Sequence, residues 1–291
     1  MAYLLALCAI VLWSTNAVTA SFVLKVLPVE QVQFLQFLGA FLVFVLFRYA
    51  SRKTNGQKRL SAAAWALGII GLTGTMIFQY VAFAIGPITE VNIIAYAWPL
   101  IAAIFVIATC NAPRPILLLS LAIAGFLGAG LVIGGDQLVQ FGFVTNSYGF
   151  IAAVASALCM AIYSFGIGRT KTNANDVLIP GSIIGLIITA IWCFHGNVEW
   201  NISWPLAAGL YLGAGPMGAG YLFWSWAMQK DPNGNTALFG FLTPITSTGL
   251  LFFNGLMLET TSLIGAVIVI GCCTIIGLQS REQEHQSAKN A

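Results

Sequence analysis

Ten long stretches without a charged side chain run through this 291-residue chain, and they constrain its fold more than any other feature. They cover residues 1–24, 31–47, 60–89, 91–113, 115–135, 137–168, 177–194, 200–229, 232–258 and 260–280. A helix needs about 20 apolar residues to cross the hydrocarbon core of a bilayer. Only 7% of the residues are charged, whereas a soluble domain has about a quarter. The sequence therefore excludes a soluble enzyme and predicts a polytopic membrane protein.

The fold class that we predict is an all-α polytopic membrane protein with ten transmembrane helices. Barrel strands are disfavoured because the stretches do not alternate apolar and polar residues. The predicted helices lie near residues 3–24, 31–50, 62–84, 89–110, 115–134, 147–168, 177–194, 205–228, 234–256 and 260–279.

The basic residues predict how this bundle is oriented, since Lys and Arg are kept on the cytoplasmic side of a membrane. With ten helices, 11 of the 12 basic residues fall on one side, and only Lys25 falls opposite. The eleven are Arg48, Arg52, Lys53, Lys58, Arg59, Arg114, Arg169, Lys171, Lys230, Arg281 and Lys289. We therefore expect both termini to be cytoplasmic.

Two segments suggest an internal repeat. GPITEVNIIAYAWP (86–99) and DPNGNTALFGFLTP (231–244) each carry two prolines twelve residues apart, and a shift of 145 residues superimposes them. The same shift pairs Gln79 with Trp224 and Tyr96 with Phe241, and a shift of 147 pairs Trp13 with Met160 and Asn16 with Tyr163.

This pairing predicts two five-helix repeats, 1–135 and 147–280, followed by a cytoplasmic tail over 281–291. Because five is odd, the second repeat would enter the membrane inverted, as in many secondary transporters. The alternative is a ten-helix bundle whose prolines match by coincidence.

The predicted spans contain no Asp, Glu, Lys, Arg or His at depth, since Arg48, Glu90 and His195 lie at span edges. Ionisable groups at depth usually mark proton relays and ion paths. Their absence argues against an intramembrane protease and a charge-lined pore, and the six cysteines lack metal-binding spacing. We expect no cofactor, no metal and no nucleic-acid partner, and a substrate held by aromatic faces, amides, hydroxyls and backbone.

Candidate substrate-binding residues are the aromatic, amide and thioether side chains that share helix faces at depth. Trp13 and Asn16 are three residues apart on one helix, for example, and Asn92 and Tyr96 are four apart on another. Trp98 lies about 200° from Tyr96 on a regular helix, so it would share that wall only if Pro99 distorted the helix. The predicted set is Trp13, Asn16, Gln79, Tyr80, Phe83, Asn92, Tyr96, Trp98, Met160, Tyr163, Tyr221 and Trp224.

Each candidate has a structural alternative, since aromatic stripes also pack cores and membrane amides also bond between helices. Pro99 and Pro244 are predicted hinges, because each leaves a carbonyl of the preceding turn without its helical donor. The alternative for both prolines is a kink without a function.

Several motifs together resemble a known family. They are LWS on the first helix, YVAFAIGP ending the third, VNIIAYAWPLIAAIF on the fourth and LCMAIYSFGIGR on the sixth. In this order the chain resembles the drug/metabolite transporter superfamily, in its EamA branch, from Tyr3 to Leu278. The resemblance implies a basket of ten helices around a central cavity that opens alternately to the two sides.

Within that branch, LWST (12–15) and YAWPL (96–100) resemble exporters of aromatic amino acids. By position, the resemblance places eight residues in the cavity: Trp13, Gln79, Tyr80, Phe83, Tyr96, Trp98, Tyr163 and Trp224. One departure is Ala95-Tyr96 before Ala97-Trp98, where those exporters often have Asn-Tyr before Leu-Trp-Pro.

The resulting expectation is a monomeric transporter in the bacterial inner membrane that exports amino acids, aromatic or neutral, from the cytoplasm by facilitated transport. Its partners would be the small-molecule substrate and the lipid bilayer. An exporter of another substrate class, such as a cationic drug, a nucleobase or an osmolyte, is the alternative. An intramembrane enzyme or a channel is a remoter one.

Overall fold

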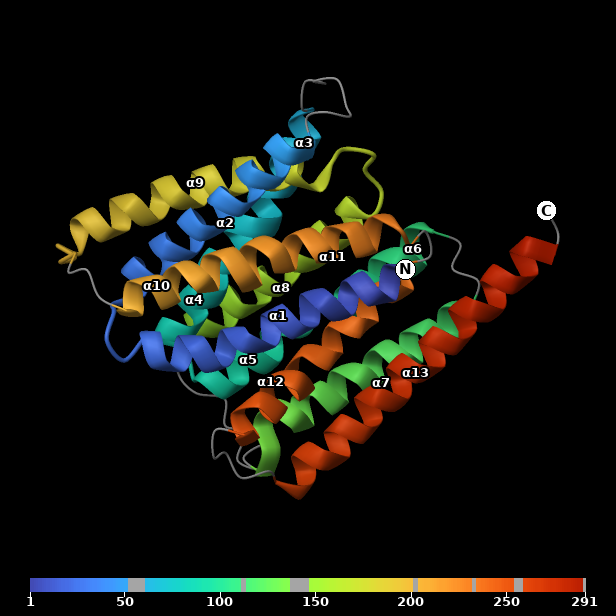
Figure 1. Cartoon of the computed structure of the whole chain (residues 1–291). Coiled ribbons are helices and arrows are strands. Elements are labelled where there is room, and N and C mark those ends of the chain that lie inside the picture. Colours follow the sequence, from blue (N-terminus) through green and yellow to red (C-terminus); the bar gives the residue numbers. More distant parts are fainter. Residues whose placement is uncertain are drawn as a thin grey trace.

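The computed structural model describes residues 1–51, 61–110, 114–136, 147–200, 204–231, 234–253 and 259–289. Within these ranges every regular element is helical. Figure 1 shows the helices as long rods packed side by side. Four of the basic residues used to predict the orientation, Arg52, Lys53, Lys58 and Arg59, lie outside the described residues.

In the described part of the chain, six helical rods run without interruption, and four others are divided. The undivided rods are α1 (Ala2–Val23), α2 (Val29–Ser51), α7 (Pro115–Gly134), α8 (Ser147–Ile167), α9 (Ala174–His195) and α13 (Thr260–Lys289). The divided rods are α3 (Ala62–Gly68), η1 (Ile69–Gly74) and α4 (Thr75–Ile85); α5 (Ile88–Ala95) and α6 (Trp98–Thr109); α10 (Trp204–Leu212), η3 (Gly213–Ala219) and α11 (Gly220–Gln229); and η4 (Asn235–Phe241) and α12 (Leu242–Phe253).

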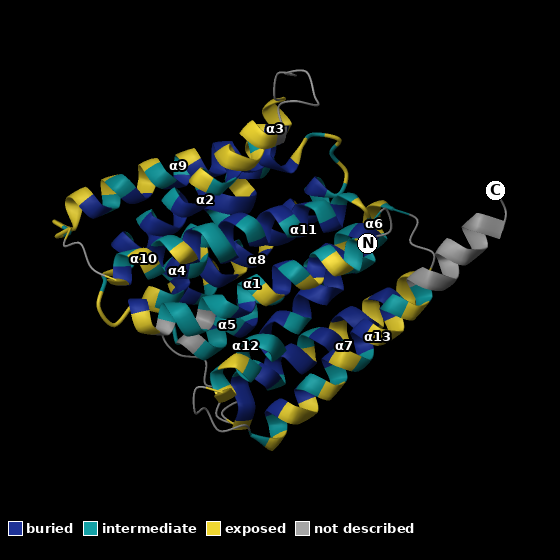
Figure 2. Cartoon of the chain, viewed as in Figure 1, coloured by how far each residue is buried: buried dark blue, intermediate teal, exposed yellow. Residues whose placement is uncertain are grey.

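Among the described residues, nine helical segments are long and apolar enough to cross a membrane. Their outer faces stay apolar: Val267 on α13 is 71% exposed and Ile191 on α9 is 53% exposed. Figure 2 shows exposed residues, in yellow, along both helices. A helix that is apolar on all sides is typical of a lipid environment. The predicted eighth span, 205–228, is not among the nine, since its many glycines and aromatic residues lower its hydropathy.

The interruptions fall at matching places in the two halves of the chain. The third rod contains the π-helical turns of η1, and the eighth rod contains those of η3. The shift of 145 that was predicted from the prolines moves residues 69–74 onto 214–219, which lie within η3. It also moves Tyr96, at the break between α5 and α6, onto Phe241, the last residue of the 3₁₀ helix η4.

Close glycine contacts hold the divided rods against α2 and α9. A methyl group added to Gly68 would lie 1.7 Å from the Val177 carbonyl oxygen on α9. One added to Gly213 would lie 2.3 Å from the Gln36 carbonyl oxygen on α2. Only small residues allow backbones to approach this closely in a membrane bundle. The two halves of the chain also pack against each other in corresponding ways. Helix α1 of the first half packs on α11 of the second, and α8 of the second half packs on α4 of the first.

Two predicted boundaries differ from the structure. The tenth helix was expected to end near 279, but α13 continues to Lys289. The added residues, 281–289, include two Glu and two Gln, which form helices readily in water. The seventh helix begins at Ala174 rather than at 177, so its first turn contains Asp176, whose carboxylate is favourable at a helix N-terminus.

Candidate functional site

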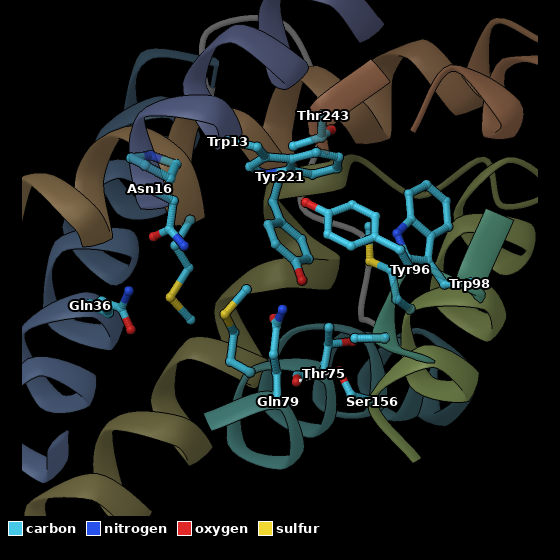
Figure 3. A pocket seen from close by; sticks show the side chains of 15 residues that line it. Trp13, Asn16, Gln36, Thr75, Gln79, Tyr96, Trp98, Ser156, Tyr221 and Thr243 are labelled. Atoms are coloured by element: carbon cyan, nitrogen blue, oxygen red, sulfur yellow. Dashed lines mark hydrogen bonds between the residues drawn. The ribbon is translucent and has the colours of Figure 1, made fainter. Parts of the chain in front are cut away.

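A central cavity of about 100 Å³ lies where the divided rods meet α1, α2 and α8. Its wall is drawn from both halves of the chain, as Figure 3 shows. The lining residues are Trp13, Asn16, Gln36, Thr75, Met76, Gln79, Ala95, Tyr96, Trp98, Ser156, Met160, Pro216, Met217, Tyr221 and Thr243.

The break in the fourth rod brings Tyr96 and Trp98 onto the same wall. A continuous helix over 89–110 was expected to separate them by about 200°. Instead α5 ends at Ala95 and α6 begins at Trp98, with Tyr96 and Ala97 in turn conformations between them. Pro99 falls in the first turn of α6, where proline is favoured. The shared wall thus results from a break in the helix directly before Pro99, the kind of distortion on which it was expected to depend.

Aromatic rings form one side of the cavity. The Trp13 ring lies edge-on to Tyr221, with centroids 5.8 Å apart, and Tyr96 and Trp98 continue the wall. In Figure 3 these rings occupy the upper and right parts of the view. Such a surface offers apolar area and negative ring faces, which attract both apolar groups and cations.

Amides and hydroxyls form the other side. The side chains of Asn16, Gln36 and Gln79 face the cavity from α1, α2 and α4, in the left and lower parts of Figure 3. Gln36 is held in place, since its Nε2 donates to the Tyr80 hydroxyl over 2.8 Å and its Oε1 accepts from Gln33. Fixed amides of this kind orient a polar ligand group.

A buried hydroxyl on the wall, that of Thr243, has no partner of its own among the described residues. The Thr243 side chain is 3% exposed, and its Oγ1 forms no hydrogen bond within the described part of the chain. A buried polar atom left unpaired costs free energy.

None of the lining residues is charged, and all of them lie in described segments. In the same described part of the chain, no three His, Cys, Asp or Glu residues are grouped as metal ligands. The site can therefore act by shape, stacking and hydrogen bonds.

Seven of the twelve predicted binding residues lie on the cavity wall. They are Trp13, Asn16, Gln79, Tyr96, Trp98, Met160 and Tyr221. The other five are Tyr80, Phe83, Asn92, Tyr163 and Trp224, which the structure places behind or beside it.

Those five residues have other surroundings. Tyr80 supports Gln36 from behind and packs on Phe83, with ring centroids 6.0 Å apart. Asn92 lies on α5, where its carbonyl accepts from Tyr96. Tyr163 and Trp224 are completely buried next to the cavity, and each bonds a serine on the opposite helix.

Sequence reasoning missed Gln36, Thr75, Ser156, Pro216, Met217 and Thr243, and did not select Met76 or Ala95. Two signals were present for part of this set. Gln31, Gln33 and Gln36 are three amides in an otherwise apolar helix, and the shift of 145 pairs Thr243 with Trp98.

The sequence model of the EamA-like transporter family matches residues 1–134 and, a second time, residues 147–278. The chain belongs to this family. A curated EamA-type relative, the aromatic amino acid exporter YddG of Ancylobacter novellus, is 27% identical over 223 residues, which are 75% of this chain and 76% of that protein.

A solved structure described only as "Crystal structure of protein" matches 97% of this chain and 97% of its own, with a TM-score of 0.82 and 25% identity. The apolar helices and the family together identify a multi-pass membrane transporter of the EamA family. The resemblance noted from the sequence motifs is thereby confirmed.

Proposed function

We propose that this EamA-family protein exports amino acids, aromatic or neutral, from the cytoplasm across the inner membrane of a bacterium. The observation that carries this proposal is the uncharged cavity, with aromatic rings on one side and amides on the other. A zwitterion with an apolar side chain presents the complementary surfaces. The name of the Ancylobacter novellus relative supports the same substrate class.

The cavity suggests how such a substrate would bind. Its side chain would lie against Trp13, Tyr96 and Tyr221, and its carboxylate would accept from the amides of Gln79 and Asn16. The ammonium would meet a ring face or the Ala95 carbonyl, to which Pro99 has no N–H to donate. Cation–π contacts contribute about 0.5 to 2 kcal/mol, so we expect weak, roughly millimolar affinity, as suits an efflux carrier.

We further propose that the chain spans the membrane ten times as two inverted repeats, over 1–135 and 147–280, and acts as a monomer. The eighth span would be Trp204–Gln229, which adds to the nine apolar segments. Support comes from the double family match and from the matching π-helical turns. Alternating access between two such repeats is common among transporters of this architecture.

The orientation that we propose places both termini in the cytoplasm. It is supported by Arg114 before α7, Arg169 after α8 and Lys230 after α11, which all lie at helix ends on the same side under this topology. Pro99 and Pro244 would be hinges, since each lies in the first turn of a helix that follows a break. Rotation at those breaks would move Tyr96 and Trp98 relative to the rest of the wall.

Counterflow in proteoliposomes tests the substrate class. Purified protein is reconstituted with an internal pool of unlabelled amino acid, and entry of labelled tryptophan, leucine, lysine and glutamate is measured. We expect entry of tryptophan and leucine but not of lysine or glutamate. Gln79→Leu should abolish most of the entry of tryptophan and leucine. Gln279→Leu on α13, away from the cavity, should not abolish this entry. Counterflow of an organic cation or a nucleobase, with none of any amino acid, would contradict the proposal.

A further inference from the structure

Two reciprocal hydrogen bonds join α8 to α11 directly beyond the cavity. Trp224 Nε1 on α11 donates to Ser164 Oγ on α8 over 3.0 Å, and the Tyr163 hydroxyl on α8 pairs with Ser225 Oγ on α11 over 2.6 Å. Ser225 donates its own hydrogen to the Tyr221 carbonyl, so Tyr163 is the donor in the second pair. Adjacent residues on each helix thus bond adjacent residues on the other.

These side chains close the end of the cavity. Met160 on α8 and Tyr221 on α11 line it, and Tyr163 and Trp224 follow three residues later on the same helices, completely buried. The next turn is also closed, since Ile167 is 0% and Met228 is 2% exposed. No continuous passage therefore runs between α8 and α11 beyond Met160.

Neighbouring elements complete the layer. The Trp224 ring packs against Trp13 on α1 and Trp98 on α6, with centroids 5.2 and 5.3 Å away. The Tyr163 ring lies against Gly71 in η1, where an added methyl group would fall 2.1 Å from the ring. Trp224 and Tyr163 thus lie where α1, η1, α6, α8 and α11 pack together.

The matching positions in the first half of the chain are arranged differently. The shift of 147 pairs Tyr163 with Asn16, and the shift of 145 pairs Trp224 with Gln79. Asn16 and Gln79 line the cavity, whereas Tyr163 and Trp224 seal it. The cavity is therefore closed on one side by groups whose counterparts in the first half of the chain form part of its wall.

We propose that the pairs Tyr163–Ser225 and Trp224–Ser164 form the cytoplasmic gate of the transporter, and that both pairs separate when the cavity opens to the cytoplasm. The assignment to the cytoplasm rests on the orientation and the alternating access proposed above, because α8 and α11 are followed by Arg169 and Lys230. Hydrogen bonds between membrane helices shift such equilibria modestly, about 3-fold each. Loss of both should shift the ratio of closed to open gate about 10-fold if the bonds are independent.

Cysteine accessibility tests the gate without any substrate, so its outcome is separate from that of the counterflow experiment. Met76→Cys places a reporter on the cavity wall. Inside-out membrane vesicles are treated with a membrane-impermeant methanethiosulfonate, and modification of the peptide that contains residue 76 is followed by mass spectrometry. The native protein, which has Met76 instead of the reporter cysteine, gives the background signal for this peptide.

We expect Ser225→Ala and Trp224→Phe each to raise the rate of modification from the cytoplasmic face about 3-fold, and the double variant about 10-fold. Ser182→Ala is the matched control, because that buried hydroxyl donates to Ile179 within α9. If Trp224→Phe does not yield folded protein, Ser225→Ala alone decides. Unchanged rates, an equal increase in Ser182→Ala, or an increase confined to right-side-out vesicles would each overturn the proposal.

Discussion

The Tyr80 hydroxyl accepts a 2.8 Å hydrogen bond from the Gln36 side chain, and Gln36 forms part of the cavity wall while Tyr80 does not. The tyrosine therefore affects the cavity through the glutamine. Gln36 is 1% exposed and Tyr80 is 5% exposed, so the bond is buried. In a site that has no charges, the orientation of an amide decides whether it offers a donor or an acceptor.

Tyr80→Phe should weaken substrate binding without stopping transport. Removal of the hydroxyl leaves the Gln36 amide held by Gln33 alone, and loss of one such bond costs about 0.5 to 1.5 kcal/mol. We expect KM in counterflow to rise about 2- to 10-fold with little change in the maximal rate. Tyr148→Phe, at a position 75% exposed, is the control. A lower maximal rate with an unchanged KM would instead assign Tyr80 to the conformational change.

Gly220→Ala should narrow the cavity. A methyl group at this position would lie 2.8 Å from Nε1 of Trp13, so the indole has to move, and it lines the cavity. We expect entry of tryptophan to fall more than entry of alanine in the same counterflow assay. The control is Gly249→Ala on α12, where an added methyl group meets nothing within 4 Å. Equal losses for both substrates would show that the change acts on the whole fold.

Gly68→Ala should destabilise the bundle. The added methyl group would overlap the Val177 carbonyl oxygen at 1.7 Å, and because the obstacle is backbone, α3 and α9 have to separate. Overpacking of this kind costs about 1 to 3 kcal/mol or more. The apparent melting temperature in detergent, measured by fluorescence-detected size exclusion, should fall by several degrees. Gly271→Ala on α13, with open space around it, should melt like the native protein.

Cys110, just beyond the end of α6, should react with maleimides faster than an ordinary thiol at neutral pH. Hydrogen bonds from Thr109 and Arg169 lower the pKa of the Cys110 thiol, so a larger fraction is thiolate below the usual pKa of about 8.5. Arg169→Gln should raise the pKa and slow alkylation at pH 7, and the difference should vanish above pH 9 or so, where both thiols are ionised.

The same labelling tests the orientation, because a membrane-impermeant maleimide should reach Cys110 from the cytoplasmic face. Lys171→Gln removes a positive charge two residues after Arg169 that is not among the causes of the Cys110 shift, and it should leave the rate unchanged. Labelling of Cys110 from the outer face of intact cells would show that the topology is the reverse of the proposed one.

Helical periodicity was sufficient where the helices are regular. Trp13 and Asn16 are three residues apart on α1, and both line the cavity as their spacing predicted. Tyr96 and Trp98 show the limit of that reasoning. Pro99 indicated a distortion, but the sequence did not show that the helix would end at Ala95 and begin again at Trp98. Periodicity cannot be carried across a break whose position is unknown.

Position along a rod was harder to predict than the face of a helix. Tyr163 shares a face with Met160, and Trp224 with Tyr221, yet in each pair only the earlier residue lines the cavity. A difference of one turn decides which side chain meets open space, and this depends on the neighbouring helices. Gln36 was missed for a similar reason, since only tertiary packing brings α2 to the cavity.

The absence of charge on the cavity wall has a consequence for the energetics of the transport cycle. A membrane voltage acts only on charge that moves through it, by about 2.3 kcal/mol per elementary charge per 100 mV. A zwitterion carries no net charge, and the lining residues, all within the described segments, add none in either direction. The membrane potential would therefore do no work on either the loaded or the returning carrier. The ratio of internal to external concentration would then set the direction of flux, and the protein would relieve an accumulating pool without drawing on the proton-motive force.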